Sequence, residues 1–350
     1  MESVSLNRLA WQRLKKNKLS FFAFCYIIFT VFIASFAVFI SPDSSPYANE
    51  MHIELATKRP LTEIIFLEIP NNIDSDITFF KSIFFGIPSK VTRFPIESFK
   101  IEENGITYLT YNSKTPKKYN GEYNVTKKIF FLGTDKYGRD LLSRVIYGVR
   151  VSLSVGFFAV LISLVIGISM GICAGYFRGI VDDIIMWFVN VIWSIPTLLM
   201  VIAITLALGK GFWQVFVAVG LTMWVEVARI IRGQVFVIRE LEFVEAGKAL
   251  AYKPLRIIFR HILPNVIGPL IVISSANFAA AILIESGLSF LGIGVQPPIP
   301  SWGGIIKDHY AYIIMDKAFL AIIPGLAIMS LVLAFMILGN GLRDIFDVKN

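Results

Sequence analysis

The stretch EFVEAGKALAYKPLRIIFRHILPN, residues 242–265, lies between two long apolar parts of the chain and is itself rich in charge. Its charged side chains are those of Glu242, Glu245, Lys248, Lys253, Arg256 and Arg260. Pro254 must interrupt any helix that begins near Glu242, because proline has no amide hydrogen and its ring clashes with the preceding turn. We therefore expect two short amphipathic helical pieces, with carboxylates at the start of the first and lysines towards its end, as the helix dipole favours.

The parts of the chain that flank this stretch have the composition of an integral membrane protein. Of its 350 residues, 55% are hydrophobic and 17% are charged, which is too apolar for an ordinary soluble domain. A helix needs ~20 apolar residues to cross ~30 Å of hydrocarbon, and a helix satisfies its backbone groups internally. The stretches that qualify are residues 21–40, 151–177, 184–209, 211–229, 266–284 and 318–342. The sequence thus predicts an all-α membrane protein with six transmembrane helices.

The distribution of cations predicts the orientation of these helices. The first span is preceded by Arg8, Arg13, Lys15, Lys16 and Lys18. By the positive-inside rule these cations place the N-terminus in the cytoplasm, and alternation then places residues 41–150 outside and the C-terminus inside. The first span is too long for a signal peptide and has no small-x-small cleavage site, so we expect an uncleaved anchor. The net charge of +8 is attributed to this orientation, and no nucleic-acid partner is expected.

The same reasoning divides the chain into consecutive regions. The expected regions are a cytoplasmic tail at 1–18, a transmembrane helix at 19–40, an extracytoplasmic insertion with a surface helix at 41–146, transmembrane helices two to six at 147–342 with a cytoplasmic loop at 233–265, and a cytoplasmic tail at 343–350. The cytoplasmic loop contains the charged stretch quoted above.

The insertion, residues 41–132, predicts a small strand-rich domain. Residues 99–109 alternate in character around Asn104-Gly105, a pair that favours the tight turn of a β-hairpin. The core of such a domain is expected to be thin, because the region is short. Two interpretations stay open, namely a docking surface for an extracytoplasmic partner and a loosely ordered loop that covers the membrane domain.

A short amphipathic helix is expected at the end of the insertion. Asp135 is a candidate N-cap for this helix. Its apolar side would be formed by Leu141, Leu142, Val145 and Ile146, and its polar side by Arg139, Asp140, Ser143 and Arg144. A helix with this pattern lies on the membrane surface.

The sequence has no constellation of residues that points to catalysis or to a bound cofactor. Cys25 and Cys173 fall within expected spans, and His52, His261 and His309 lie far apart in the sequence. The metal-binding spacing H-E-x-x-H and the phosphate-binding loop G-x-x-x-x-G-K-[ST] do not occur. We therefore expect a chain that is not an enzyme and binds neither a metal nor ATP. The charged stretch then has two interpretations, a helix on the membrane surface or a helix seated in the groove of a soluble partner.

The charged stretch resembles a known motif. Its residues 245–251 and 261–264 are similar to the E-A-A-x-x-x-G-x₉-I-x-L-P loop of the permease subunits of binding-protein-dependent ABC importers. The spacing is intact, but Gly247, Ala251 and His261 stand where the family has alanine, glycine and isoleucine. Further segments resemble the second permease of the oligopeptide/dipeptide branch, namely residues 133–153, 195–198, 288–303 and 341–344. The insertion lies largely outside this resemblance.

The resemblance implies a type I ABC importer permease fold in the cytoplasmic membrane of a bacterium. It implies that the inner loop is a coupling helix in a cleft of a cytoplasmic ATPase, which uses ATP and Mg²⁺, while this chain binds no cofactor. The residues implied to carry the coupling are Glu245, Ala246, Gly247, Lys248, Ala251, His261, Leu263 and Pro264. The other implied partners are a second permease, an extracytoplasmic substrate-binding protein and membrane lipid. Peptides are the implied cargo, with nickel or glutathione, which related systems carry, as alternatives.

Charged residues within the expected spans are further candidate functional residues. Glu226 makes the fourth span the weakest, and it lies one helical turn before Arg229, which predicts a neutralised pair near the inner face in preference to a contact with the cargo. Glu285, at the outer end of the fifth span, either lines the pathway or caps a turn. Trp187 and Asn190 stand where the branch has an arginine and an aspartate, so both members of a possible ion pair are replaced together.

Two other classes of protein compete with an importer permease. A secondary transporter or channel should have repeated spans, or broken helices with several acidic residues at mid-membrane, and neither is visible in the sequence. A membrane-anchored enzyme would need a catalytic constellation in the insertion, where His52 stands alone. The sequence therefore favours the importer permease.

Overall fold

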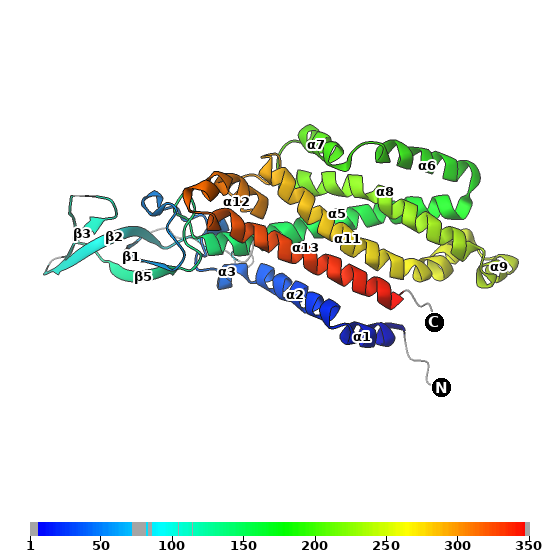
Figure 1. Cartoon of the computed structure of the whole chain (residues 1–350), viewed down its shortest axis with the longest axis horizontal. Helices are drawn as coiled ribbons and strands as arrows, with labels where there is room; N and C mark the ends of the chain where they lie inside the picture. Colours follow the sequence, from blue (N-terminus) through cyan, green and yellow to red (C-terminus); the bar gives the residue numbers. More distant parts are fainter. Residues whose placement is uncertain (1–5, 72–81, 83–85, 104, 114, 347–350) are drawn as a thin grey trace. The chain divides into compact units, whose positions relative to one another are not determined.

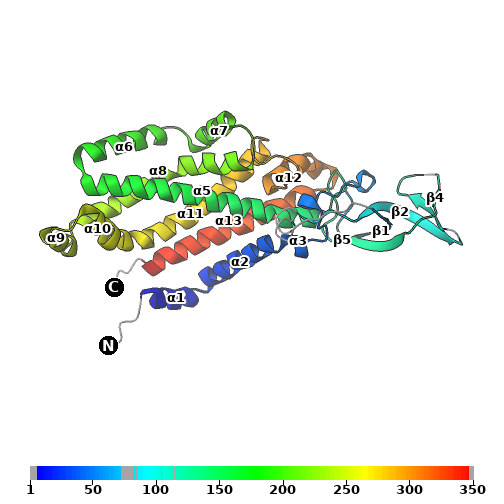
Figure 2. The same cartoon turned by 180° about the vertical axis from the view of Figure 1, so that it is seen from behind.

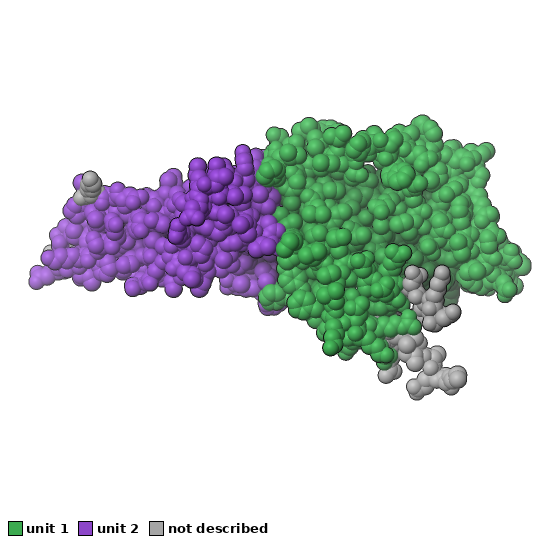
Figure 3. Space-filling model, in the orientation of Figure 1, with its two compact units in different colours: residues 1–29, 152–295, 328–350 green, residues 30–151, 296–327 purple. Residues whose placement is uncertain are grey.

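The computed structural model describes residues 6–71, 82, 86–103, 105–113 and 115–346. The chain forms two compact units, which Figure 3 shows in different colours. Unit 1 consists of residues 1–29, 152–295 and 328–350, and unit 2 consists of residues 30–151 and 296–327. The described part of unit 1 is helical, whereas unit 2 combines a β-sheet with short helices.

Long helices make up most of unit 1 (Figures 1 and 2). They are α1 (Leu6–Lys16), α2 (Lys18–Ser35), α5 (Leu141–Phe177), α6 (Gly179–Trp193), α7 (Thr197–Leu208), α8 (Phe212–Arg239), α11 (Ile267–Phe290) and α13 (Phe319–Phe346). The helices α2, α5 and α13 also contribute residues to unit 2. The charged stretch forms α9 (Glu242–Ala249), α10 (Pro254–Ile257), the π-helical turn η3 (Ile258–Ile262) and the 3₁₀ turn η4 (Leu263–Val266).

The apolar helices agree with the expected spans, with one correction. Among the described residues, the helices long and apolar enough to cross a membrane are Lys18–Ser35, Leu141–Phe177, Phe212–Arg239, Pro254–Phe290 and Phe319–Ile345. A sixth span exists only if α6 and α7 are counted together, and these two helices meet at 90°. The expectation of one unbroken helix over residues 184–209 is therefore wrong. Pro196 lies at the break and has no amide hydrogen with which to continue the preceding helix.

The helix α8, which contains the span expected to be weakest, is the most buried of the five long helices. Three glycines of α5 explain how closely it packs. A methyl group on Gly167, Gly171 and Gly175 would lie 2.6, 2.8 and 2.7 Å from the Cβ atoms of Val227, Ile231 and Val235 of α8. Only a hydrogen atom fits at these positions, so the small residue at every fourth position brings the two helix backbones together. Close packing thus stabilises α8 in spite of its charged residues.

Unit 2 contains a five-stranded antiparallel sheet with the strand order β4-β3-β2-β1-β5. Its strands are β1 (Thr62–Pro70), β2 (Val91–Glu102), β3 (Gly105–Thr110), β4 (Lys117–Tyr119) and β5 (Asn124–Phe130). Successive residues of β1 point to opposite faces, so Phe66 joins one apolar cluster and Leu67 the other. The prediction of a small strand-rich domain is confirmed.

The expected hairpin over residues 99–109 is present in this sheet. Phe99 pairs with Tyr108 in the antiparallel register of β2 and β3, and the pairing continues to Glu102 and Gly105. Asn104, which was expected to form the turn with Gly105, lies outside the described residues. The alternating sequence on either side of the turn was therefore a sufficient signal for the two strands.

The remaining described elements of unit 2 are short helices. They are α3 (Ala37–Ile40), η1 (Pro46–Ala48), η2 (Ile53–Leu55), α12 (Trp302–His309) and η5 (Tyr310–Met315). The side chain of Ser301 caps α12 by accepting a hydrogen bond of 3.1 Å from the amide of Gly304. The indole of Trp302 donates to the carbonyl of Val145 at 2.9 Å, so α12 is fixed to the first turns of α5.

The separate surface helix expected after Asp135 does not exist. The helix α5 begins at Leu141 and continues without a break to Phe177. Asp140 caps it, because its carboxylate accepts hydrogen bonds from the amide of Leu142 and the hydroxyl of Ser143. The side chains expected on an exposed polar side, those of Arg139, Asp140, Ser143 and Arg144, are all buried. The sequence of this region predicted an amphipathic surface helix because charged residues that are paired inside a protein can have the same spacing as charged residues on a surface.

Candidate functional site

The charged stretch begins with α9, which ends in a tightly bonded turn. The amide of Tyr252 donates to the carbonyl of Gly247 at 3.1 Å, and the amide of Ala251 donates to that of Lys248 at 2.9 Å. This pair of bonds is the Schellman arrangement, in which the residue after the helix adopts a left-handed conformation. Ala251 occupies that position with φ of 54°. Glycine is favoured there, so the alanine at position 251 is a strained choice.

One face of this segment belongs to the core of unit 1. Val244, Ile257 and Ile262 are buried in a cluster that also contains residues of α5, α8 and α11. Gly247 is buried as well, and a methyl group there would lie 3.5 Å from Tyr252. The segment is therefore held on the helix bundle by apolar packing, which makes it move with the bundle.

The other face is exposed and mixes charged with large apolar side chains. Among the residues expected to couple, Glu245, Ala246, Lys248, Ala251 and Pro264 are exposed, His261 and Leu263 are half-buried, and Gly247 is buried. Phe243, Leu250, Leu255 and Phe259 are between 41% and 67% exposed on the same segment. A surface with exposed apolar side chains among charges is typical of an interaction site.

An aromatic stack that the sequence analysis did not predict joins the two parts of the segment. The guanidinium of Arg256 lies 3.9 Å from the centre of the Tyr252 ring, and that ring is stacked on His261 at 6.2 Å. The ring of Phe243, on α9, lies 6.3 Å from His261. Such contacts contribute about 0.5–1.5 kcal/mol each, so the stack stiffens the connection between α9 and η3. The aromatic residues on both sides of Pro254 were the feature of the sequence from which this stack could have been predicted.

Ion pairs hold the start of α6 against the end of α8, and α8 directly precedes the charged segment in the sequence. Asp182 of α6 accepts two hydrogen bonds of 2.5 Å from Arg232 of α8, a bidentate arrangement. Arg178, just before α6, pairs with Glu240 at 2.5 Å. These pairs were missed because their members are at least 50 residues apart in the sequence. They join the start of α6 to the end of α8, whose C-cap Glu240 is separated from α9 by Leu241 alone.

The expected pair of Glu226 and Arg229 is not formed. The guanidinium of Arg229 lies instead over the ring of Trp193, 3.7 Å from its centre, at the end of α6. Glu226 is exposed, and no cation among the described residues forms an ion pair with it. The one-turn spacing permits a pair, but the aromatic face is the closer partner for the arginine.

Glu285 is fully buried within α11, which extends past the expected end of the span. Its carboxylate accepts a hydrogen bond of 2.7 Å from Ser289, and the hydroxyl of Ser289 accepts one of 3.1 Å from the amide of Val295. This chain of bonds holds the loop after α11 against the helix. The geometry therefore favours the turn over a contact with the pathway.

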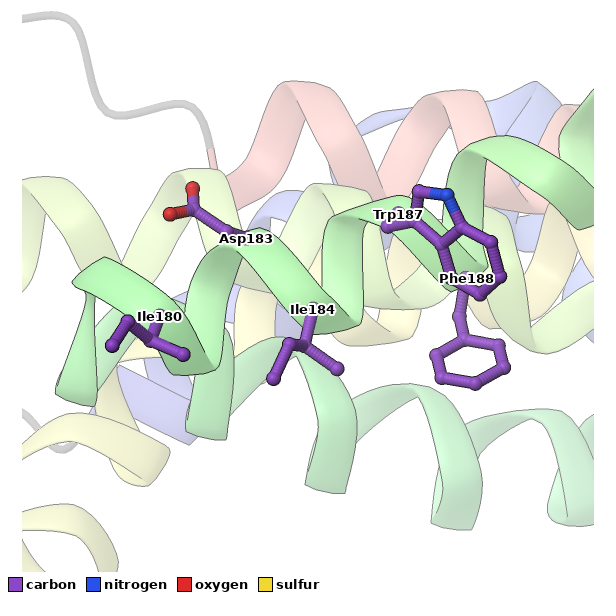
Figure 4. A pocket seen from close by; sticks show the side chains of 5 residues that line it. All are labelled: Ile180, Asp183, Ile184, Trp187 and Phe188. Atoms are coloured by element: carbon purple, nitrogen blue, oxygen red, sulfur yellow. The ribbon is translucent and has the colours of Figure 1, made fainter.

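The outer face of α6 carries a shallow depression (Figure 4). It is lined by Ile180, Asp183, Ile184, Trp187 and Phe188. Trp187 occupies one of the two positions where the branch was expected to have charges, and Asn190 at the other is also exposed. The opposite face of α6, which includes Val189, packs against α8. The rings of Trp187 and Phe188 contact each other at 4.9 Å, and both side chains are exposed.

The motif at residues 133–140 forms a buried network in unit 2. The carboxylate of Asp135 accepts hydrogen bonds from the amides of Tyr137 and Arg139 and from the guanidinium of Arg139 at 2.6 Å. Gly138 has φ of 73°, and a methyl group there would lie 1.7 Å from the carbonyl oxygen of His52. His309 accepts a hydrogen bond from the amide of Lys136, and burial lowers the pKa of this histidine. These features indicate a structural role for the motif.

No group of His, Cys, Asp and Glu side chains within the described ranges is arranged to hold a metal ion. The polar contacts described above connect parts of the fold to one another. The exposed face of the charged segment offers a surface for binding through ionic and apolar contacts.

Comparison with known proteins identifies the family to which this chain belongs. Residues 142–349 match the family described as "Binding-protein-dependent transport system inner membrane component", and residues 5–56 match the "N-terminal TM domain of oligopeptide transport permease C". These matches confirm the resemblance found in the sequence, and they confirm the fold class of a membrane permease with several apolar helices.

Individual relatives agree with this family. The dipeptide transport system permease protein DppC of Lactococcus lactis is 32% identical over 347 residues, 99% of this chain and 92% of the relative. The glutathione transport system permease protein GsiD of Pectobacterium atrosepticum is 39% identical over 219 residues, 63% of this chain and 72% of the relative. A solved structure of the inward-facing methionine ABC transporter MetNI is 18% identical with a TM-score of 0.48, covering 59% of this chain and 97% of that one. The two family models leave residues 57–141 unmatched, so most of the insertion lies outside them as expected, although the Lactococcus alignment spans nearly the whole chain.

Proposed function

This chain belongs to the family of binding-protein-dependent transport system inner membrane components, and we propose that it forms half of the pathway of an ATP-driven peptide importer. The observation that carries the proposal is the segment from α9 to η4. Its inner face is part of the helix core, while its outer face exposes Glu245, Lys248 and large apolar side chains. A segment built in this way transmits a force from a bound partner to the helices.

The partner of this segment is a cytoplasmic ATPase. ATP and Mg²⁺ act in that subunit, and this chain contributes a surface that moves with it. Glu245 supplies a charged contact on the exposed side of α9, and Gly247 lets α9 lie close to Tyr252 and Ile257. Movement of α9 reaches α8 through their common core, and α6 through the pair of Asp182 and Arg232. The membrane helices then rock between two arrangements as rigid bodies.

The other partners follow from the incomplete pathway. One chain with a single coupling segment provides half of a transport path, so a second permease completes it, and an extracytoplasmic binding protein delivers the cargo. The apolar outer face of α6 faces lipid or that second permease. The chain spans the cytoplasmic membrane of a bacterium with both termini in the cytoplasm and the sheet of unit 2 outside. Cysteines introduced by Lys118→Cys and Lys248→Cys should then react with reagents from opposite sides of the membrane.

Small peptides are the proposed cargo. The Lactococcus relative is named for dipeptides and the Pectobacterium relative for glutathione, which is itself a small peptide. Glutathione is therefore a second candidate within the same chemical class, and it can be tested in the same assay.

The test is uptake by the reconstituted complex. Proteoliposomes that contain this chain, the second permease and the ATPases should accumulate a labelled dipeptide when ATP and loaded binding protein are supplied. Omission of the ATPases or of the second permease should abolish uptake. Transport that continues without ATP would overturn the importer assignment. Uptake of glutathione but not of dipeptides would change the substrate and keep the mechanism.

A further inference from the structure

Glu226 lies near the middle of α8, and the described residues of unit 1 leave its side chain exposed. The helix has 28 residues, which at 1.5 Å per residue is a length of about 42 Å. The hydrocarbon core is ~30 Å thick, which is more than half of the length of this helix. If the helix spans the core completely, its middle therefore lies within the hydrocarbon. The carboxylate of Glu226 is therefore at membrane depth and exposed.

The exposed face continues from Glu226 towards the α9 end of the helix. Ile230, Gly233 and Val237 follow at intervals of four, three and four residues, so they share one face of α8, on which Ile230 is half-buried against the core and the others are exposed. Val237 is 66% exposed, and a methyl group built on Gly233 meets nothing within 4 Å. We call these four residues the open stripe of α8.

Lipid is a poor neighbour for the open stripe. An ionised carboxylate in hydrocarbon is costly, and charges at membrane depth face a protein interior or a water-filled path. Arg229 cannot neutralise Glu226 at this position, because its guanidinium is held over Trp193 at 3.7 Å. The break between α6 and α7 follows directly after Trp193, and broken helices are tolerated in membranes where they line a cavity or are buried. Two independent features thus favour a wet path beside α8.

We propose that the open stripe of α8 lines the transport path and that Glu226 binds the α-ammonium group of the passing peptide. This inference rests on the proposed function. A peptide with a free N-terminus always carries such a cation, whatever its side chains, so one carboxylate serves many sequences. The contact to a charged group is worth about tenfold in affinity, enough to guide a peptide without trapping it.

The first test is the accessibility of position 226 in the reconstituted complex. Glu226→Cys is made in a Cys25→Ser, Cys173→Ser background, and so is Leu221→Cys, whose exposed side chain lies on another side of α8. A water-soluble cationic thiol reagent should modify the cysteine at 226 and leave that at 221 largely unreacted. Loaded binding protein and ATP should slow the modification at 226. Absence of reaction at 226 would mean that a second permease or lipid covers the stripe, and it would overturn the proposal.

The second test measures the carboxylate itself and does not depend on a cysteine variant. Glu226→Gln should lower uptake of an alanine dipeptide about tenfold at limiting concentration, the loss of one charged hydrogen bond. Glu226→Asp should restore most of it, and ATP hydrolysis and assembly with the second permease should stay unchanged. Normal uptake by Glu226→Gln would refute ammonium binding. If the complex with Glu226 intact does not transport peptides, the proposed function itself is wrong. That outcome is distinct from normal uptake by Glu226→Gln, which refutes only the binding of the ammonium group.

Discussion

Two segments next to membrane helices, α9 to η4 and the motif at residues 133–140, both mix acidic and basic residues but place them differently. In the first, Glu245 and Lys248 are exposed. In the second, Asp135 and Arg139 are buried and joined by a hydrogen bond of 2.6 Å. The difference lies in whether each charge has a partner of opposite sign within the fold. Unpaired charges remain on the surface for another molecule, whereas paired charges are part of the interior.

The comparison also separates two kinds of consequence. Loss of a buried pair leaves one charge without compensation, so folding should suffer first. Loss of an exposed charge costs little stability, so only a contact with a partner should suffer. Stability and transport, measured together on the same variants, therefore show which kind of segment a residue belongs to.

The largest effect is expected at the buried pair. Arg139→Ala leaves the buried Asp135 carboxylate with Arg144, at the longer distance of 3.8 Å, as its ion-pair partner, and should lower the free energy of unfolding by about 3–5 kcal/mol. Thermal unfolding of the purified chain in detergent measures this change. The matched control is Lys248→Ala on α9, which should shift stability by no more than about 0.5 kcal/mol. Equal losses in the two variants would abolish the distinction between the segments.

At α9 the expected effect is a loss of transport, with Glu245→Ala leaving the stability of the protein nearly unchanged. Glu245→Ala should reduce uptake to background because it removes the exposed charge that is proposed to contact the ATPase, while the protein still inserts in the membrane. Gly247→Leu should do the same, because its side chain cannot fit beside Tyr252 and Ile257.

Gly247→Ala is the control for the effect of volume. A methyl group at position 247 has an ordinary contact distance of 3.5 Å to Tyr252, so this variant should keep its transport. Uptake and co-purification with the ATPase are measured for all three variants. Normal values for Glu245→Ala and Gly247→Leu would remove α9 from the coupling surface.

A third prediction uses pH to identify paired charges in unit 2. Although burial opposes it, the contacts with His52 and Arg93 lower the pKa of Glu50 from 4.5 to about 2. Because the folded-state pKa is the lower one, the ionised carboxylate stabilises the fold above pH 4.5, and this contribution disappears as the pH falls towards 2. Glu50→Gln should therefore lower stability near pH 7 by on the order of 3 kcal/mol, and by much less in strong acid.

Hydrogen exchange in β1 and β2 measures this local stability across the pH range. Glu63→Gln is the matched control, because its partner Lys127 is exposed and their surface pair is worth little. A loss at Glu50 that does not change with pH would show that packing, and not charge, connects it to the sheet.

Sequence patterns predicted what depends on local composition. The apolar runs predicted the long helices, and alternation around Gly105 predicted the hairpin, because both patterns repeat within a few residues. The break at Pro196 had a visible signal, but the apolar character of residues 184–209 outweighed it in the prediction. The pair of Asp182 and Arg232 had no local signal at all, since the fold brings together residues far apart in sequence.

The candidate site was predicted in part. Its residues Glu245 and Lys248 lie on an exposed face, as a docking segment requires, and this role remains a prediction. The pair of Glu226 and Arg229 was predicted from spacing alone and is wrong, because spacing says nothing of the Trp193 ring that competes for the arginine. Backbone conformation was equally hidden, because the sequence does not show that Ala251 adopts a left-handed conformation.

The smallest effect is expected at Ala251, and its sign is what matters. Its φ of 54° costs an alanine about 1–2 kcal/mol, a strain that glycine does not have. Glycine also raises the conformational entropy of the unfolded chain, which lowers stability by about 0.4–1 kcal/mol. Ala251→Gly should therefore stabilise the end of α9 by roughly 0.5 kcal/mol, the difference of these terms. Ala249→Gly, the same change two residues earlier but inside α9, should destabilise it by about 0.5–1 kcal/mol. Exchange of the Tyr252 amide, which closes the turn, measures both variants, and a loss of protection in both would mean that the left-handed turn does not form.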